Sequence, residues 1–306
     1  MKNPSIDKWI QRVLATDPPR SKSVVMTVFG DSIASHGGAA WLGSLIELLA
    51  PFGISDRLVR TSIFRLAKEG WLEASREGRR SLYTLTASGL RRVELAYRRI
   101  YAPPNLTWQG NWIILFAPPG IISTTERGAL RKELLWEGFS MIAPGVFGHP
   151  GDNIDVLEEI LGRVGVRGKL FVCQAKELSQ FGSRPLRDLV EHGWELKPVL
   201  QGYQHFIKQF GSLLTHVDDA TKPEQSFVIR TLLMHAFRRV QLHDPLLPTE
   251  LLPKNWPGIA AYDLCHQIYQ RTYASAEQYL LATLRREDQN VAPAAAAFYQ
   301  RFGGLL

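Results

Sequence analysis

Arginine and lysine side chains in two neighbouring groups are the residues of this chain best suited to a specific chemistry. The first group has helical spacing and consists of Arg57, Arg60, Arg65 and Lys68. The second group surrounds Gly78 and consists of Arg76, Arg79 and Arg80. Guanidinium and ammonium groups bind phosphate oxygens, and arginine also forms paired hydrogen bonds with the edge of guanine. The pattern therefore predicts recognition of a nucleic acid.

A helix that begins after Ser55 must position the first group. Ser55 is the expected N-cap, and Asp56 suits the positive start of a helix. At about 100° per residue, the side expected to face the core holds Val59, Ser62, Ile63 and Leu66. The opposite side and its flanks hold Arg57, Arg60, Thr61, Phe64, Arg65 and Lys68. A phenylalanine on a DNA-reading face can contact a thymine methyl group. The alternative is an ordinary charged surface helix in which Phe64 packs on a neighbouring helix.

A hairpin is expected directly after this helix and must position the second group. Gly70 provides the turn, residues 71–76 and 81–85 form the strands, and Gly78 at the tip is free to take a positive φ. A cationic helix followed by a cationic hairpin is how a winged helix-turn-helix meets DNA. The predicted DNA-binding residues are Ser55, Arg57, Arg60, Thr61, Phe64, Arg65, Lys68, Arg76, Arg79 and Arg80.

Helices are also expected on both sides of this segment. Residues 21–35 and 41–49 precede it, and residues 86–101 follow it with Arg91, Arg92, Arg98 and Arg99. This last helix either extends the basic surface or is a solvated linker.

The excess positive charge of the chain is confined to its first third. Residues 1–103 contain 16 Lys+Arg against 9 Asp+Glu, a net charge of +7, whereas residues 104–306 contain 20 of each. A basic segment joined to a neutral bulk favours a nucleic-acid reader with a separate sensing or assembly part. The alternative is a basic surface that serves only solubility.

Composition and motifs limit the class of protein. With 306 residues, 45% of them hydrophobic, the chain can fill two or three domain cores. Its two cysteines, Cys173 and Cys265, lack metal-binding spacing, so we expect a reducing cytoplasm and no metal site. Neither a signal peptide nor an apolar run of ~18 residues is present, so we expect no membrane partner. Phosphate-loop, zinc-protease and nucleophile-elbow motifs are absent, and we expect neither an enzyme nor a cofactor.

Three segments resemble a known family in the order in which that family has them. The first, from Val24 to Leu85, includes Asp31, Gly53-Ile54-Ser55, residues 57–61, Arg65-Leu66, residues 69–72 and residues 78–86; the others are residues 108–115 and 230–256. On these segments the chain resembles the PaaX family of transcription regulators, repressors of phenylacetic acid degradation operons. The resemblance implies a homodimeric repressor of a palindromic double-stranded DNA operator. It also implies release by an aryl-acyl-coenzyme A effector such as phenylacetyl-coenzyme A.

Residues 105–178 are expected to form a ferredoxin-like domain. Strands at 112–117, 139–143, 145–148 and 170–173 alternate with helices at 125–138 and 154–164, the first helix directing Leu130, Leu134 and Leu135 inward. The domain is similar to the Cas2 type of CRISPR-associated domain. That similarity raises the alternative of an Mg²⁺-dependent nuclease, which needs a carboxylate after the first strand. Because Phe116-Ala117-Pro118-Pro119 ends that strand, we expect a dimerisation platform or spacer.

Residues 184–306 are expected to form an all-α effector or dimerisation domain, with helices at 196–214, 226–241 and 259–285. A cationic pocket with an aromatic wall suits a coenzyme A ligand. The candidate effector residues are Arg230, His235, Arg238, Arg239 and Trp256. The alternative is structural, with Arg238 paired to Asp244 and Trp256 in the core.

The expected fold is therefore multidomain α+β. It consists of a winged helix-turn-helix at 20–102, a ferredoxin-like domain at 105–178 and an α-helical domain at 184–306. The alternatives to an aromatic-acid repressor are the nuclease and a regulator of another catabolic operon with a different ligand.

Overall fold

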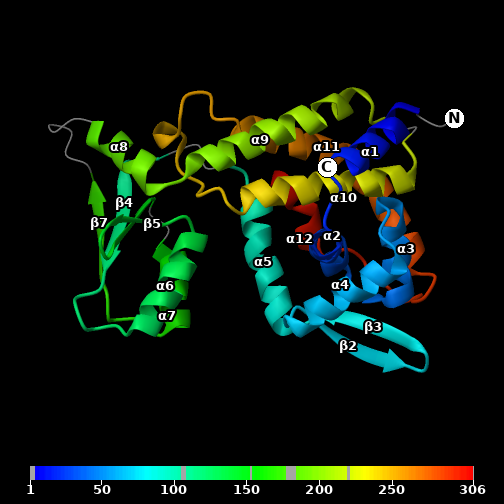
Figure 1. Cartoon of the computed structure of the whole chain (residues 1–306), viewed down its shortest axis with the longest axis horizontal. Helices are drawn as coiled ribbons and strands as arrows, with labels where there is room; N and C mark the ends of the chain where they lie inside the picture. The colour runs from blue at the N-terminus through cyan, green and yellow to red at the C-terminus, as the bar shows by residue number, and fades with distance from the viewer. Residues whose placement is uncertain (1–3, 105–107, 152–153, 177–183, 219–220, 306) are drawn as a thin grey trace. The chain divides into compact units, whose positions relative to one another are not determined.

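The chain forms two compact units (Figure 1). The computed structural model describes residues 4–104, 108–151, 154–176, 184–218 and 221–305. The first unit contains Met1–Pro103, Tyr203–Leu242 and Ile259–Leu306, and the second contains Pro104–Gly202 and His243–Gly258. Helices from the last third of the chain thus share a unit with its first hundred residues. The three domain ranges expected from the sequence remain a prediction, and residues 105 and 178 lie outside the described residues.

The first unit begins with a helix that the sequence analysis did not predict. α1 (Pro4–Thr16) buries Ile6, Trp9 and Val13, which have helical spacing. α2 (Ser21–Thr27) continues as a π-helix, η1 (Val28–Ile33), and a 3₁₀ turn, η2 (Ala34–His36), where one α-helix to Ser35 was expected. The wider π-helical turn buries the polar residues Asp31 and Ser32 together with their apolar neighbours.

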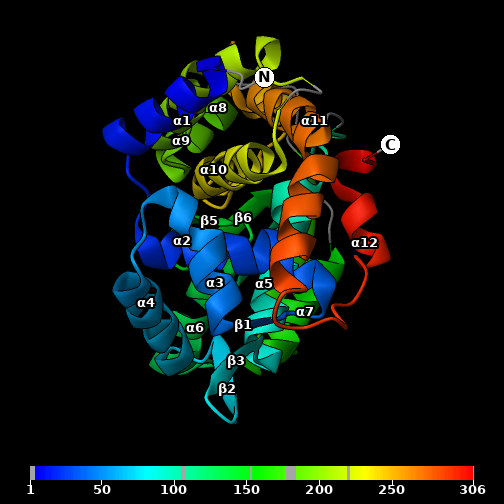
Figure 2. The ribbon, with the colours of Figure 1, turned by 90° about the vertical axis from the view of Figure 1, so that its right-hand side faces the viewer.

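The recognition segment follows in the expected order, with one short strand added. β1 (Ala39–Trp41) leads into α3 (Leu42–Leu49), then η3 (Ala50–Phe52), α4 (Asp56–Lys68), β2 (Leu72–Glu77), β3 (Arg80–Leu85) and α5 (Ala87–Tyr101). The strands form an antiparallel sheet in the order β1-β3-β2, with Trp41 opposite Leu82. The β2–β3 hairpin projects from the helices of this unit (Figure 2).

Helix α10 (Pro223–Gln241) is the central helix of the first unit (Figure 2). It packs against α1, α2, η1 and α5, and every residue from Gln225 to His235 is buried. The remaining helical elements after residue 184 are α8 (Arg184–Gly193), α9 (Leu196–Phe210), η5 (Gly211–Thr215), η6 (Thr249–Leu251), α11 (Gly258–Leu284), α12 (Ala296–Tyr299) and η7 (Arg301–Gly303). No strand occurs among the residues described from 184 onward. No described helix is long and apolar enough to cross a membrane.

The second unit has the predicted βαββαβ order. It consists of β4 (Asn111–Phe116), α6 (Thr124–Trp136), β5 (Ser140–Ala143), β6 (Val146–Pro150), α7 (Ile154–Val164) and β7 (Phe171–Lys176). The sheet order is β5-β6-β4-β7 with antiparallel neighbours, the arrangement of a ferredoxin-like fold.

Alternating side chains of β4 fill two cores on opposite faces of this sheet. Ile113 and Leu115 pack with α6 and α7, whereas Trp112 packs with Val190 and Trp194 at α8.

The expectation for Leu135 was wrong: Leu130 and Leu134 are buried, but Leu135 is 48% exposed because it lies one residue off the inward stripe.

Candidate nucleic-acid interface and buried polar network

The outer face of α4 is open to solvent. Val59, Ser62, Ile63 and Leu66 are buried, so the predicted phase of the helix is confirmed. The seven candidates on this segment are all exposed: Ser55, Arg57, Arg60, Thr61, Phe64, Arg65 and Lys68. Phe64 is 69% exposed, which contradicts the alternative that it packs on a neighbouring helix. A largely exposed aromatic side chain among basic residues is suited to contact with DNA bases.

Two hydroxyl groups on this segment differ from their expected roles. Ser55 occupies the N-cap of α4 but makes no capping hydrogen bond with its side chain. The Thr61 hydroxyl donates to the Arg57 carbonyl oxygen at 2.8 Å. Thr61 is a candidate DNA-binding residue, but its hydroxyl proton is used within the helix. Only its oxygen remains, and it can accept a hydrogen bond from a base or a protein group.

The cations of this surface have two kinds of environment. Within the described part of the chain, Arg57, Arg60, Arg65, Lys68, Arg76 and Arg79 have no side-chain hydrogen bond or ion pair. Arg80 is also exposed, but its guanidinium group has protein partners. Gly78 adopts a φ of 59° at the hairpin tip, which permits the tight turn between Glu77 and Arg80. The six cations without partners are available for phosphate or base contacts.

Helix α5 extends the exposed basic surface only in part. Arg91, Arg92 and Arg98 are exposed, and the Arg92 guanidinium carbon lies 4.8 Å from the centroid of the Trp71 ring. Arg99 is 7% exposed and does not contribute to that surface. It lies within about 20° of the exposed Arg92 on the helix, so its burial comes from packing at the end of α5, where Gln241 of α10 donates to the Arg99 carbonyl oxygen at 3.0 Å.

The candidate effector residues on α10 are engaged with other parts of the first unit. Arg238 Nε donates to Thr27 Oγ1 at 2.9 Å, and its Nη2 donates to both Ser23 oxygens. His235 Nδ1 lies 3.2 Å from the same Thr27 oxygen. Burial, with the charges of Arg238 and Arg239, lowers the pKa of His235 to about 3, so the ring is neutral at physiological pH. These contacts favour a structural role for His235 and Arg238 in this conformation.

Arg239 and Trp256 differ from these two in their surroundings. Arg239 is exposed on α10. Trp256 is half-buried and packs on the core of the second unit that contains Trp112 and Trp194, in line with the structural alternative. An effector role for all five candidates stays a prediction.

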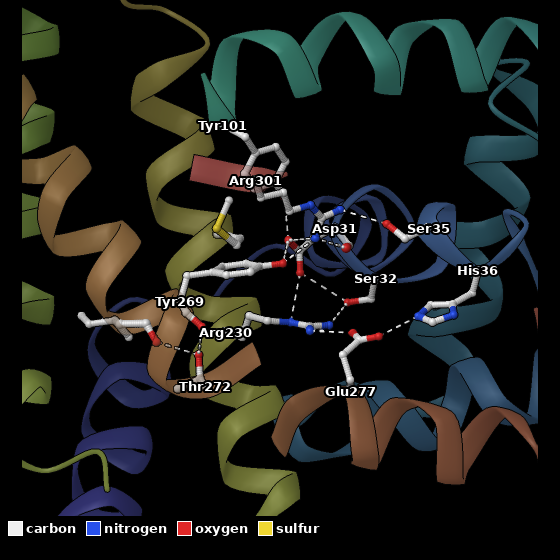
Figure 3. Close-up of polar contacts among 12 residues, drawn as sticks. Asp31, Ser32, Ser35, His36, Tyr101, Arg230, Tyr269, Thr272, Glu277 and Arg301 are labelled. Atoms are coloured by element: carbon white, nitrogen blue, oxygen red, sulfur yellow. Dashed lines mark hydrogen bonds and ion pairs between the residues drawn. The ribbon is translucent and has the colours of Figure 1, made fainter. Parts of the chain in front are cut away.

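Arg230 belongs to a buried polar network centred on Asp31 (Figure 3). The Asp31 carboxylate lies 3.2 Å from Arg230 Nε and 3.3 Å from Arg301 Nη1. It also accepts hydrogen bonds from the hydroxyls of Tyr101 at 2.6 Å and Tyr269 at 3.1 Å. Five elements, η1, α5, α10, α11 and η7, therefore meet at one carboxylate.

A second carboxylate extends this network. Glu277 Oε1 accepts from Arg230 Nη1 at 2.7 Å, and Glu277 Oε2 lies 2.7 Å from His36 Nε2 (Figure 3). Arg230 Nη2 also donates to Ser32 Oγ at 2.8 Å. The network therefore links the start of the chain to residues more than 200 positions away.

The electrostatics of the network fix its protonation. Burial tends to raise the pKa of Glu277, but Arg230 and the contact with His36 outweigh it and lower that pKa to about 2. Burial tends to lower the pKa of Arg230, and its neighbours Tyr269, Glu277 and Asp31 bring it above the usual value. Burial raises the pKa of Tyr101, so its hydroxyl stays a donor. At neutral pH the network thus contains a charged carboxylate beside a charged guanidinium.

This network was not predicted from the sequence. Asp31 was expected only as part of a family pattern, and Arg230 only as an effector candidate. A signal was present, because Asp31 interrupts the apolar stripe of Val24, Val25, Val28, Phe29 and Ile33. A carboxylate on a buried face needs a cationic partner, but the sequence does not reveal which one. No three described His, Cys, Asp or Glu residues come together in a way that could hold a metal ion.

Comparisons with known proteins cover nearly the whole chain. Three family models match: a PaaX-like protein over residues 20–89, the PaaX protein central Cas2-like domain over 105–190, and the PaaX-like protein C-terminal domain over 194–282. The Transcriptional repressor PaaX of Escherichia coli (strain K12) is 37% identical over 303 residues, 98% of this chain and 95% of the relative. A solved structure of an uncharacterised protein from Mycobacterium tuberculosis is 26% identical with a TM-score of 0.48, covering 83% of this chain and 98% of that one.

Proposed function

The chain belongs to the PaaX family, and on that premise we propose that it is a transcriptional repressor that binds operator DNA through α4 and the β2–β3 hairpin. Its relative is a transcriptional repressor, a regulator without catalytic activity, and this chain is likewise a regulator and not an enzyme. The nuclease alternative therefore has no support from the comparisons. The described residues also place no carboxylate at the end of β4, where such a site would need one.

The exposed face of α4 is the observation that carries this proposal. Phe64 shares one side of the helix with Arg57 and Arg60, whose guanidinium groups have no partner among the described residues, and the opposite side of the helix is buried. We assign the segment from α2 to β3 to a winged helix-turn-helix, with α4 as the recognition helix and the hairpin as the wing. In that assignment the helix enters the major groove, and Arg76 and Arg79 contact the flanking phosphates.

We further propose that the repressor acts as a homodimer on a palindromic operator of an aromatic-acid catabolic operon. Half-sites about one DNA turn apart would then match its two recognition helices. The effector would be an aryl-acyl-coenzyme A thioester, as the family resemblance implies. An effector releases a repressor only if it binds the DNA-free conformation more tightly than the DNA-bound one. No covalent step is required.

Fluorescence anisotropy tests the proposal on the full-length protein. The protein is titrated onto labelled DNA from upstream of its own gene and onto random DNA of equal length, at one salt concentration, with and without phenylacetyl-coenzyme A. We expect tight binding to its own DNA and loss of that binding with the thioester. Tight binding that is unchanged by the thioester supports the repressor function but indicates a different effector. Equal, weak binding to both DNAs contradicts operator recognition.

A further inference from the structure

Arg80 differs from the other cations of the hairpin because its guanidinium group lies on the protein. The guanidinium carbon is 4.4 Å from the centroid of the Trp41 ring, and Trp41 is itself buried. Nη1 of Arg80 donates to the backbone carbonyl oxygen of Glu287 at 3.1 Å. Arg76 and Arg79 have no comparable contact among the described residues. The first residue of β3 is therefore connected to a segment more than 200 positions later in the chain.

The segment that receives Arg80 is the turn directly after α11. The amides of Glu287 and Asp288 both donate to the Leu284 carbonyl oxygen, at 3.2 and 3.1 Å, so the turn continues the end of the helix. Its backbone is thereby held to α11, and the carbonyl group that meets Arg80 has a fixed position. We name residues 285–288 the α11 turn.

Helix α3 holds the α11 turn at two further points. Arg286 Nη1 forms an ion pair with Glu47. The Glu287 side chain occupies the space beside Gly43, where a Cβ atom would lie 1.8 Å from Glu287 Oε1. Any side chain at position 43 would therefore displace the Glu287 carboxylate, and glycine permits the close approach. The α11 turn thus connects Arg80, next to the tip of the hairpin, to α3, the helix that precedes α4.

We infer that Trp41, Arg80 and the α11 turn form a clamp that sets the position of the hairpin relative to α4. Arg80 is then a positioning residue, whereas Arg76 and Arg79 contact phosphate; these roles rest on the proposed function. The physical reason is that the outer part of the hairpin, beyond the pairing of Trp41 with Leu82, is two-stranded and marginally stable by itself, so its direction depends on contacts with the rest of the unit. The guanidinium group stacked on Trp41 and its hydrogen bond to Glu287 supply two such contacts.

The clamp also connects the hairpin to the buried network. Helix α11 carries Tyr269 and Glu277 in the network and ends in the turn that holds Arg80. A displacement of α11 would therefore reach the hairpin through a continuous helix and one hydrogen-bonded turn. This is a physical path by which a change elsewhere in the unit can alter DNA binding.

Neighbouring variants separate positioning from phosphate contact. Operator and random-DNA affinities are measured by anisotropy for wild type, R79A, R80A and R80K. The salt concentration is varied from about 50 to about 200 mM, a range over which phosphate contacts make affinity fall steeply. R79A should flatten the slope of log affinity against log salt concentration by about 0.9, the value for one phosphate contact. R80A should leave the slope unchanged and lower operator affinity more than random-DNA affinity. R80K keeps the charge but loses the stacked planar group, so it should resemble R80A.

A flatter slope in R80A together with wild-type behaviour of R80K would overturn the clamp, because both are expected of a phosphate contact. Hydrogen exchange of the DNA-free protein gives a second, independent measurement. In R80A and R80K, the amides of residues 72–85 and of the α11 turn should exchange about two to five times faster, the factor for one exposed cation–π contact. Unchanged exchange there also overturns the clamp. If wild type does not distinguish operator from random DNA, the proposed function fails while hydrogen exchange still decides the clamp.

Discussion

Replacing Arg230 by methionine removes a charge from the centre of the first unit while keeping much of the side-chain volume. Arg230 is 0% exposed and faces the carboxylates of Glu277 at 2.7 Å and Asp31 at 3.2 Å. In R230M, Asp31 keeps Arg301 and two tyrosine hydroxyls, whereas Glu277 keeps only His36 as an ion-pair partner among the residues that the structure describes. Removing one partner of a buried ion pair typically costs about 3–5 kcal/mol. Because domain stabilities are about 5–15 kcal/mol, the loss should be readily measured.

Urea unfolding followed by circular dichroism measures this loss and apportions it. We expect R230M to lower the free energy of unfolding by about 3–5 kcal/mol. The double variant R230M/E277Q should be more stable than the sum of the two single losses predicts, by at least about 1 kcal/mol, because glutamine removes the buried charge left unpaired. R12M is the matched control: Arg12 is exposed on α1, and its loss should change stability by no more than about 0.5 kcal/mol.

Two results would refute this reasoning. If R230M changes the free energy of unfolding by no more than R12M does, the charge of Arg230 contributes nothing that methionine cannot replace. If the losses of R230M and E277Q simply add, the two side chains act independently despite their contact of 2.7 Å.

Three other predictions concern the recognition helix and the pH dependence of stability. R60A should cost about 1–3 kcal/mol on the operator if Arg60 reads a base; an unchanged operator-to-random affinity ratio in anisotropy titrations would exclude base reading. F64A should weaken operator binding and change the unfolding free energy by at most about 0.5 kcal/mol, because the ring is 69% exposed; a loss of about 3–5 kcal/mol in urea unfolding would show that the ring fills core. Since the pKa of Glu277 is lowered from 4.5 to about 2, its stabilisation is present above pH 4.5 and is lost as the pH falls towards 2. The difference in unfolding free energy between wild type and E277Q should therefore shrink by about 3 kcal/mol over that range, and a difference independent of pH would contradict this.

The phase of α4 was predictable because a buried helix face repeats every three to four residues. Val59, Ser62, Ile63 and Leu66 are all on the predicted side, and the exposure of Phe64 follows from the same geometry. The order of strands and helices in the second unit was predictable for a similar reason: each element is short, local and bounded by glycine or polar residues. α1 and β1 were missed: α1 lies in a segment read only for targeting signals, and β1 is three residues long.

The partners of charged side chains were not predictable in the same way. Arg80 was grouped with Arg79 because the two are adjacent in a basic hairpin, yet only Arg80 meets Trp41 and Glu287. The structural alternative paired Arg238 with Asp244, close by in sequence, but the described contacts of Arg238 are with Ser23 and Thr27. Neighbours in sequence are a poor guide to the partner of a long cationic side chain.

The sequence by itself determined the local elements, the distribution of charge and the family to which the chain belongs. These properties depend on periodicity, composition and residue patterns that lie within short segments. Only the tertiary structure decided that α10 belongs with the first hundred residues and that Asp31, Arg230, Glu277 and Arg301 meet in one network. An ion pair between residues 31 and 230 leaves no periodic trace in the sequence. It forms because a buried charge must find an opposite charge wherever the folded chain brings one within reach.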